Sequence, residues 1–362
     1  MSQTKTNLKK GYQLSAPSLR AWRIAQACVW LIGAAILCCL LFYQSTGLLL
    51  FWNILIPLAP ALLVVFTGLW RNICPLATTN LLPRHLRLSK GKKLTARQSG
   101  VLNLVAVVAL FTIVPLRHAI FNQNGIATAM LIITLVLAGI IPGLFYEWKS
   151  VWCSGLCPVH PVEKLYGGNV LMPLPNAHCT NCMNCVVPCP DSTTTAHPVS
   201  SGKTIYQRLS MLLIAGGLPG FIWGWFQVND EKNTGGLIQV LLAVYKIPLI
   251  GMASTLTVFF ITYTFINRAF EKKLVNIFAA AGVSCYYWYR IPALLGFGKA
   301  RAEGLLIDMR GTWPQWVVQL LTVTAIAFFF YWLAIRKQNN KSWLLRPQFG
   351  AKTPRVKPNT LV

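Results

Sequence analysis

Residues 126–146 read IATAMLIITLVLAGIIPGLFY, a run of 21 residues without a charged side chain. About 20 apolar residues in a helix span the hydrocarbon core of a bilayer, so this run predicts a transmembrane helix. Hydrophobic residues make up 55% of the 362 residues and charged residues only 11%, which is unlike the composition of soluble domains. The chain is therefore predicted to be an integral membrane protein.

Apolar stretches of spanning length recur along the chain. Besides 126–146 they lie at 24–44, 47–70, 99–116, 209–228, 236–267 and 314–335. A weaker stretch at 274–298 contains an arginine and a proline. Pro57 and Pro60 predict a kink in the second span, and Pro248 predicts a tilt or a break in the sixth. The expected fold is an all-α polytopic membrane protein with about eight transmembrane helices.

The distribution of positive charge predicts the orientation of these helices. The chain has 33 Lys and Arg residues against eight acidic ones, a net charge of +25. Counted by segment, 26 of the 33 fall in the arm before the first span, in 71–97, 148–208 and 268–273, and after Ile335. Because positive loops are retained inside, both termini are predicted to be cytoplasmic, in an inner-membrane, multi-pass protein. The same distribution argues against nucleic-acid binding, which would gather cations on one soluble face.

Five segments follow from these spans. They are a cytoplasmic basic arm (1–23), membrane helices 1–4 (24–147), a cytoplasmic polar insert (148–207), membrane helices 5–8 (208–335) and a cytoplasmic basic tail (336–362). The insert is too short for a large hydrophobic core. Metal-thiolate bonds can organise a loop of this length instead.

The insert contains the clearest motif of the chain, Cys179-Thr-Asn-Cys182-Met-Asn-Cys185-Val-Val-Pro-Cys189-Pro190. This is the C-x-x-C-x-x-C-x-x-x-C-P run of bacterial ferredoxins, which ligates [4Fe-4S] clusters through its thiolates. In two-cluster ferredoxins the fourth cysteine ligates the other cluster, so a lone run leaves its last ligand open. A zinc knot fits less well, because it usually separates two cysteine pairs by a dozen residues or more.

Two Cys-Pro elements follow membrane spans. Cys153-Ser-Gly-Leu-Cys157-Pro follows the fourth span, and Trp70-Arg-Asn-Ile-Cys74-Pro follows the second. Superimposing the two Cys-Pro pairs puts Trp70 where the later copy has Cys153. This pattern favours an internal repeat of a helix hairpin with one cysteine missing from the first copy. The alternative is that these residues are buried thiols at helix ends.

Together, Cys74-Pro75, Cys153-x-x-x-Cys157-Pro and the cysteine run resemble the membrane-bound ferredoxin-type proteins of the NapH, NosR and CcoG kind. The resemblance covers about residues 47–207. It implies an electron carrier or oxidoreductase subunit that relays single electrons through [4Fe-4S] clusters between a quinone pool, or a flavin, and a partner redox enzyme. The alternative that it implies is an assembly or maturation factor that reduces a metal or thiol for a respiratory enzyme.

The family pattern commonly has two runs and two complete C-x-x-x-C-P elements, whereas this chain has one run and one and a half elements. Its expected ligands number seven, one fewer than two cubanes require: Cys74, Cys153, Cys157, Cys179, Cys182, Cys185 and Cys189. One cluster is therefore expected and a second is left open. His160 or His178 is a candidate for an eighth ligand, since histidine binds iron in Rieske centres.

Four ionisable residues fall at membrane depth or near it. Arg117 and His118, at the outer end of the third span, are candidates for a quinone or haem site. The alternative is that they anchor the helix end among the lipid headgroups. Lys246 and Arg290 lie deeper in their apolar stretches and are candidates for the same reason.

Overall fold

The computed structural model describes residues 14–86, 88–92, 94–146, 149–178, 204–228, 236–298, 304–337 and 343–345. Most of these residues are helical. Seven helices are long and apolar enough to cross a membrane: Ala16–Phe42, Gln44–Val65, Ala96–Phe121, Gly125–Phe145, Ile205–Trp225, Ile238–Phe265 and Gln315–Ile335. The chain is thus an all-α protein built for a multi-pass arrangement in the membrane, as its composition predicts.

The first half of the chain contains the first four of these helices and a set of short helices between the second and third. Its elements are α1 (Ala16–Phe42), α2 (Gln44–Leu48), the π-helix η1 (Leu49–Leu55), α3 (Ile56–Val65), α4 (Thr67–Ile73), α5 (Pro75–Thr79), α6 (Leu82–His85), α7 (Ala96–Leu116), the π-helix η2 (Arg117–Phe121) and α8 (Gly125–Phe145). Ser15, Thr95 and Asn124 cap α1, α7 and α8 by accepting hydrogen bonds from first-turn amides, which fixes where these helices begin.

The second half begins with short helices and continues with longer ones. Its elements are the π-helix η3 (Lys149–Leu156), α9 (His160–Tyr166), the 3-10 helix η4 (Gly167–Asn169), α11 (Ile205–Leu212), the π-helix η6 (Leu213–Gly217), α12 (Leu218–Trp225), α13 (Leu237–Phe265), the 3-10 helix η7 (Arg268–Phe270), α14 (Glu271–Leu294), α15 (Gln315–Phe330) and the π-helix η8 (Tyr331–Ile335). Two short strands, β1 (Leu174–Pro175) and β2 (Leu344–Leu345), pair in parallel.

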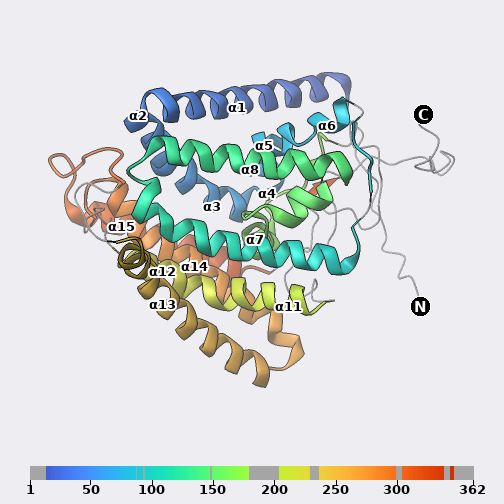
Figure 1. Ribbon diagram of the computed structural model, residues 1–362. Coiled ribbons are helices and arrows are strands. Elements are labelled where there is room, and N and C mark those ends of the chain that lie inside the picture. The colour runs from blue at the N-terminus through green and yellow to red at the C-terminus, as the bar shows by residue number, and fades with distance from the viewer. Residues whose placement is uncertain are drawn as a thin grey trace.

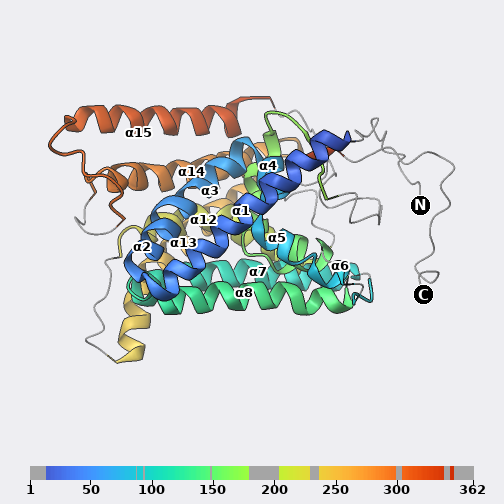
Figure 2. The ribbon, with the colours of Figure 1, turned by 90° about the horizontal axis from the view of Figure 1, so that it is seen from above.

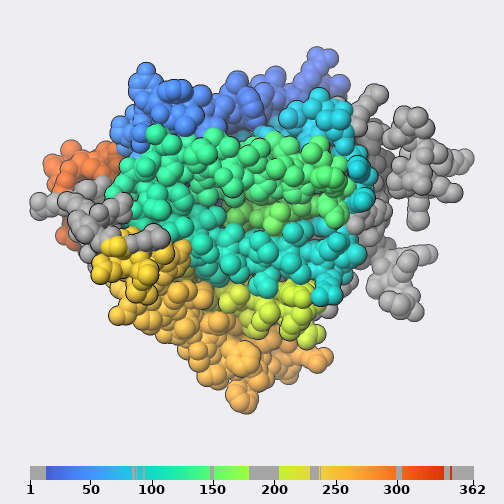
Figure 3. Space-filling view, in the orientation of Figure 1, coloured from blue at the N-terminus to red at the C-terminus, as the bar shows by residue number. Residues whose placement is uncertain are grey.

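The long helices pack side by side in one bundle. α1 lies along α8, α12 packs on α13, and α14 packs on α15 (Figures 1 and 2). The space-filling view shows α1, α8, α7 and α13 as successive bands on one face (Figure 3). Large apolar side chains such as Ile32, Val108, Met130 and Phe260 are exposed on these helices. Such an outer surface fits contact with lipid tails rather than with water.

The second span is kinked, as its prolines predict, and the kink is a π-helical segment. Pro57 lacks an N–H, so the backbone before it cannot complete its helical hydrogen bonds. Arg290 compensates from α14, because its Nη2 donates to the carbonyl of Trp52 and to Oδ1 of Asn53, both at 2.8 Å. The Tyr287 hydroxyl donates to the Pro57 carbonyl at 2.6 Å. Arg290 therefore stabilises the kinked backbone, which gives this buried cation a structural role.

The break predicted at Pro248 is wrong, since α13 runs unbroken through this residue. α12 packs tightly on the same region, where a Cβ at Gly224 would lie 2.7 Å from the Pro248 Cα and a Cβ at Gly220 would overlap the Gly251 carbonyl. This close helix packing supports α13 on both sides of the proline. Lys246 of the same helix is exposed on the outside of the bundle, so it does not line an internal site.

The weak stretch at 274–298 forms most of α14, an unbroken helix of 24 residues. At 1.5 Å per residue it is about 36 Å long, enough to span the hydrocarbon core. Its buried positions include Ala279, Ala280 and Gly282, small residues that allow close approach of neighbouring helices. It is not apolar enough to count among the seven candidate spans, so the eight-span topology stays a prediction.

Four described helix segments that belong to the regions predicted to be cytoplasmic lie at one end of the bundle. α6 and the first turns of α1, α7 and α11 lie together at the right of Figure 1, and the turn from α1 to α2 lies at the opposite end. This arrangement separates the cationic segments from the predicted outer turns.

Reporter fusions test the predicted orientation. A fluorescent protein fused after Val362 is expected to fluoresce and alkaline phosphatase fused there to be inactive, because cationic loops are retained inside. The reverse is expected for the same reporters inserted near Asn124, at the opposite end of the bundle. Paired alkaline phosphatase and fluorescent protein fusions measure both. An externally active fusion after Val362 would refute the eight-span topology.

Candidate functional site

The two Cys-Pro elements meet at the end of the bundle where α1, α7 and α11 begin. Cys74 lies between α4 and α5, and the proline after it starts α5. Cys153 lies in η3, and Cys157 follows that helix directly. Cys74 and Cys153 pack against the same buried pair, Ala77 and Leu81. The structure therefore brings together two cysteines that are far apart in the sequence.

The element with Cys153 and Cys157 is a π-helix, where the sequence predicts an ordinary helical turn. The amide of Cys157 donates to the carbonyl of Trp152 at 3.0 Å, which is the i to i−5 bond of a π-turn. Single π-turns occur frequently at functional sites. The matching segment before Cys74, α4, is an ordinary α-helix, so the two copies of the repeat differ locally.

Cys74 and Cys157 are free thiols. Burial, and then the neighbouring Cys153, raise the pKa of Cys74 to about 12. Burial, and then Glu163, raise the pKa of Cys157 well above its ordinary value. Each thiol lies close enough to affect its neighbours electrostatically, and a thiolate here needs a compensating positive charge. A coordinated metal supplies such a charge and deprotonates its thiol ligands.

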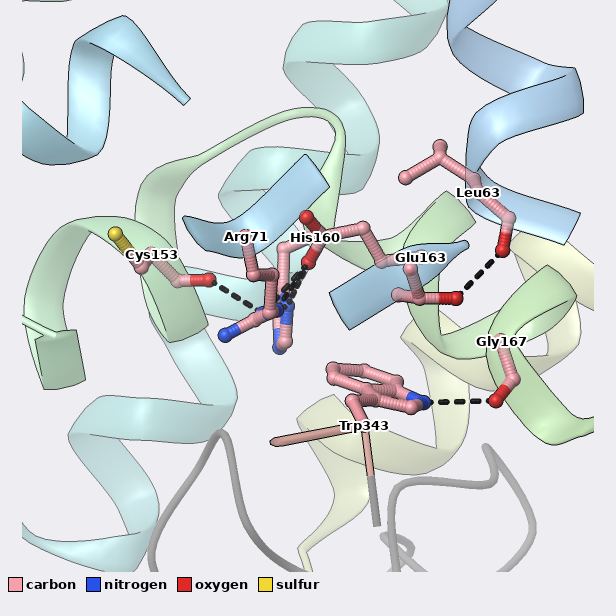
Figure 4. A network of polar contacts seen from close by, with 8 residues as sticks. Leu63, Arg71, Cys153, His160, Glu163, Gly167 and Trp343 are labelled. Atoms are coloured by element: carbon pink, nitrogen blue, oxygen red, sulfur yellow. Dashed lines mark hydrogen bonds and ion pairs between the residues drawn. The ribbon is translucent and has the colours of Figure 1, made fainter. Parts of the chain in front are cut away.

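Arg71 of α4 lies at the centre of a buried polar network beside these cysteines (Figure 4). Its Nη2 lies 2.6 Å from Oε2 of Glu163, and the two side chains are 5% and 6% exposed. The same nitrogen donates to the Cys153 carbonyl at 3.2 Å and lies 2.7 Å from Nδ1 of His160. Arg71 thus connects the first Cys-Pro element with the second one and with α9.

The protonation states in this network follow from the buried ion pair. Burial alone would raise the pKa of Glu163, but Arg71 and then His160 outweigh it and lower the pKa. Burial, and then Lys164, lower the pKa of His160 to about 3, so its imidazole is neutral. Nδ1 of His160 lies 3.1 Å from Glu163. In the tautomer whose Nδ1–H donates to Glu163, Nε2 has the lone pair that a metal ligand needs, and a histidine oriented by a carboxylate in this way is typical of metal sites.

The second ring nitrogen of His160 has no hydrogen-bond partner within the described part of the chain. Its Nε2 is buried and makes no hydrogen bond there, and the residue is 1% exposed. Buried polar atoms are nearly always paired, so such an atom calls for an explanation. In His178, by contrast, Nε2 lies 3.3 Å from the Arg71 carbonyl.

Asn72 holds the segment that leads into the cysteine run. Its Nδ2 donates to the Pro175 carbonyl at 2.9 Å, and its Oδ1 accepts from the Ala177 amide at 3.1 Å. Asn72 is completely buried, and Gln26 of α1 donates to its carbonyl at 2.8 Å. The chain is therefore fixed on α4 up to His178, one residue before Cys179.

Trp343 covers the network from the C-terminal segment. Its ring centroid lies 4.7 Å from Cζ of Arg71, and its Nε1 donates to the Gly167 carbonyl at 2.7 Å (Figure 4). Gly68 and Gly167 provide the space, because a Cβ at Gly68 would overlap the Trp343 carbonyl and one at Gly167 would lie 2.8 Å from Nε1. The sequence analysis missed this tryptophan, whose only signal is a large aromatic residue in an otherwise polar, basic tail.

The four cysteines of the ferredoxin-type run, Cys179, Cys182, Cys185 and Cys189, lie outside the described residues. Among the residues that are described, no group of three His, Cys, Asp or Glu side chains is close enough to hold a single metal ion. The described part contributes three thiols and an imidazole on neighbouring elements, so the predicted ligand set stays a prediction.

Scans of the sequence against protein-family models and against curated proteins, and a search of solved structures with the fold, found no match. The likeness to ferredoxin-type membrane proteins therefore depends on the cysteine motifs alone. Any function has to be inferred from the residues of this chain.

Glu163→Gln tests the importance of the buried ion pair. Removing one partner leaves Arg71 buried without its counter-charge, which typically costs about 3 to 5 kcal/mol. We expect a marked fall in the midpoint of thermal unfolding in detergent, measured by loss of the monodisperse gel-filtration peak. Asp308→Asn, which breaks the exposed pair with Arg310, is the matched control and should change the midpoint little. Equal midpoints for Glu163→Gln and the wild type would contradict this role.

Proposed function

We propose that this protein is a membrane electron carrier that relays single electrons through one or two [4Fe-4S] clusters between a quinone pool, or a flavin, and a partner redox enzyme. One observation carries the proposal. Both Cys-Pro elements and the segment that leads into the ferredoxin-type run converge on α4, through Arg71 and Asn72. This convergence supports the view that the seven cysteines serve one site.

The candidate metal ligands among the described residues fit a cluster that is bound by thiolates. The thiols of Cys74 and Cys157, whose pKa values are raised, favour a ligand that carries positive charge, and the buried Nε2 of His160, which has no hydrogen-bond partner among the described residues, is one further candidate ligand. Cys179, Cys182 and Cys185 would hold a first cluster, completed by Cys189 or Cys157. Cys74 and Cys153, with a non-cysteine ligand, would serve a second. A bound [4Fe-4S] cluster supplies one-electron chemistry at a potential that its surroundings set.

The residues around these cysteines would set that potential and protect the site. A thiolate-bound cubane carries net negative charge, and the guanidinium of Arg71 beside the Cys153 carbonyl would offset part of it. Trp343, which is 2% exposed, covers the network and keeps water away from Arg71. Exclusion of water and nearby positive charge are among the factors that tune iron-sulfur centres.

A second candidate function is an assembly or maturation factor that reduces a metal ion or a thiol for a respiratory enzyme. The same cysteine set would serve it, and the described geometry is equally compatible with both. Oxidation of a quinol by the purified protein would favour the electron carrier. Loss of a metal centre from another enzyme after deletion of the gene would favour the assembly factor.

Iron analysis tests the central claim. Anaerobically purified protein is expected to contain about four or about eight irons per chain with matching acid-labile sulfide, and a resonance signal on reduction. Cys182→Ala should lose a whole cluster, because a cubane deprived of one thiolate becomes labile. Wild-type iron content in Cys182→Ala would remove this residue from the ligand set, and absence of iron from the wild type would refute the proposal.

The same iron analysis distinguishes cysteines that ligate iron from cysteines that are only packed in the fold. Cys157→Ser is expected to lower iron by a whole cluster, whereas Cys285→Ser, which changes a half-buried thiol of α14, should leave it unchanged. His160→Ala should lower iron, or shift the resonance signal, if its Nε2 is a ligand, and His160→Cys should restore the lost iron. Should Cys74, Cys153 and Cys157 all tolerate Ser without loss of iron, these elements are structural and the protein holds one cluster.

A further inference from the structure

The segment of residues 82–92, which begins with α6, combines exposed leucines with lysines. Leu82, Leu86 and Leu88 are 47%, 57% and 60% exposed. Lys90 and Lys92 are exposed as well. Large apolar side chains that gather on an exposed surface mark contact with a membrane or with a protein partner. This leucine-lysine segment is therefore a candidate docking surface.

The leucine-lysine segment has a fixed shape, with one side turned toward the bundle. The Leu86 amide donates to the Leu82 carbonyl at 3.0 Å, an i to i−4 bond that puts both leucines on one face. The Leu88 amide donates to the Pro83 carbonyl at 2.8 Å. Leu81 and Pro83 are buried, so Leu82 between them points away from the bundle. The exposure of these leucines thus follows from the fold of the segment.

Contacts with α8 place the segment at the level where this span ends. The Lys90 amide donates to the Leu144 carbonyl at 2.8 Å, and the Lys92 amide donates to the Phe145 carbonyl at 3.0 Å. Both carbonyls belong to the last two residues of α8. α6 lies beside the same end of α8 in both ribbon views (Figures 1 and 2). Because α8 is long and apolar enough to span, its end marks the boundary between the hydrocarbon core and the lipid headgroups.

The apolar outer surface of α8 continues into the leucine-lysine segment. Ile141 and Phe145, one turn apart on α8, are exposed. Nζ of Lys90 lies 5.5 Å from the centroid of the Phe145 ring. The apolar stem of a lysine covers such a surface while its ammonium group stays at the polar boundary. This continuity favours lipid over a soluble protein as the partner of the segment.

The charge of the segment favours one kind of lipid. Residues 82–92 contain four Lys or Arg residues and no Asp or Glu. Within the described part of the chain, Lys90 and Lys92 form no ion pair. Cationic segments beside a membrane helix are attracted to anionic lipids and are only weakly attracted to neutral ones. An anionic headgroup is therefore the complementary partner.

We propose that the leucine-lysine segment binds anionic phospholipids, with its leucines among the upper acyl chains and with Lys90 and Lys92 at the phosphate groups. A zwitterionic lipid accommodates the leucines but brings no net charge to the lysines. An acidic soluble protein neutralises the lysines but does not continue the apolar surface of α8. The inference is independent of the proposed electron transfer, because no cysteine takes part in it.

Photo-crosslinking of the full-length protein in lipid vesicles tests this surface. The vesicles contain phosphatidylcholine and a minor share of phosphatidylglycerol with identical acyl chains, and the photoreactive residue benzoylphenylalanine takes the place of Leu86. We expect irradiation to attach lipid at this position, with phosphatidylglycerol over-represented among the adducts identified by mass spectrometry. The same replacement at Leu137, exposed near the middle of α8, is the control and should capture the two lipids in their bulk proportion.

Neutralising the lysines separates the effect of charge from that of the apolar contact. Lys90→Gln combined with Lys92→Gln should lower the over-representation of phosphatidylglycerol at position 86, by up to about fivefold for each lysine, while lipid is still captured. Lys272→Gln combined with Lys273→Gln, at an exposed pair in the first turn of α14, is the matched control and should leave it unchanged. High salt should lower it too, because salt screens exposed charges.

Three results would overturn the proposal. The first is capture of the two lipids at position 86 in their bulk proportion, and the second is an over-representation that survives the loss of both lysines. The third is capture of protein in place of lipid. Adducts with this chain itself would show that the segment is covered from within, and adducts with another protein in cell membranes would identify a protein partner.

Discussion

The ion pair between Arg71 and Glu163 is the contact on which the architecture around the Cys-Pro elements depends. It joins α4, which follows the second span, to α9, which follows the fourth, in a place with almost no access to water. A buried pair of this kind adds little net stability compared with apolar packing, but the loss of one partner is costly. Its value lies in specificity: the neighbouring carbonyl, imidazole and indole can be satisfied in only one arrangement of the two helix ends.

Around this pair the molecule uses backbone irregularity in a consistent way. The second span kinks at a π-helix whose carbonyl Arg290 satisfies, and the Cys153 segment is a π-helix beside Arg71. In both places a guanidinium accompanies backbone that departs from regular α-helix. Arginine suits this task, because its several rigidly held donors reach two or three acceptors at once.

The helical membrane fold could be predicted because its signal is local: each span is a run of apolar residues, and length alone identifies it. The continuity of α13 through Pro248 could not, because it depends on the close contact with the glycines of α12. At the candidate site, the spacing of the cysteines allowed them to be predicted as metal ligands from the sequence. Arg71, Asn72 and Trp343 were not, since their importance comes from partners more than 90 residues away along the chain. Arg117 was a candidate because of its position at the end of an apolar stretch, whereas its contacts with Trp52 and Trp225 needed the tertiary structure.

The position of Trp343 has a consequence for how the protein matures. This residue follows all seven candidate spans found among the described residues, yet it covers a network built by residues 71 to 167. Chains fold from the N-terminal end as they are synthesised, so the network forms while its cover has not yet been made. The cysteine side stays accessible during that interval, and docking of Trp343 against Gly68 and Gly167 closes it afterwards. The C-terminal segment thus imposes an order in time, in which the Arg71 network forms first and Trp343 covers it last.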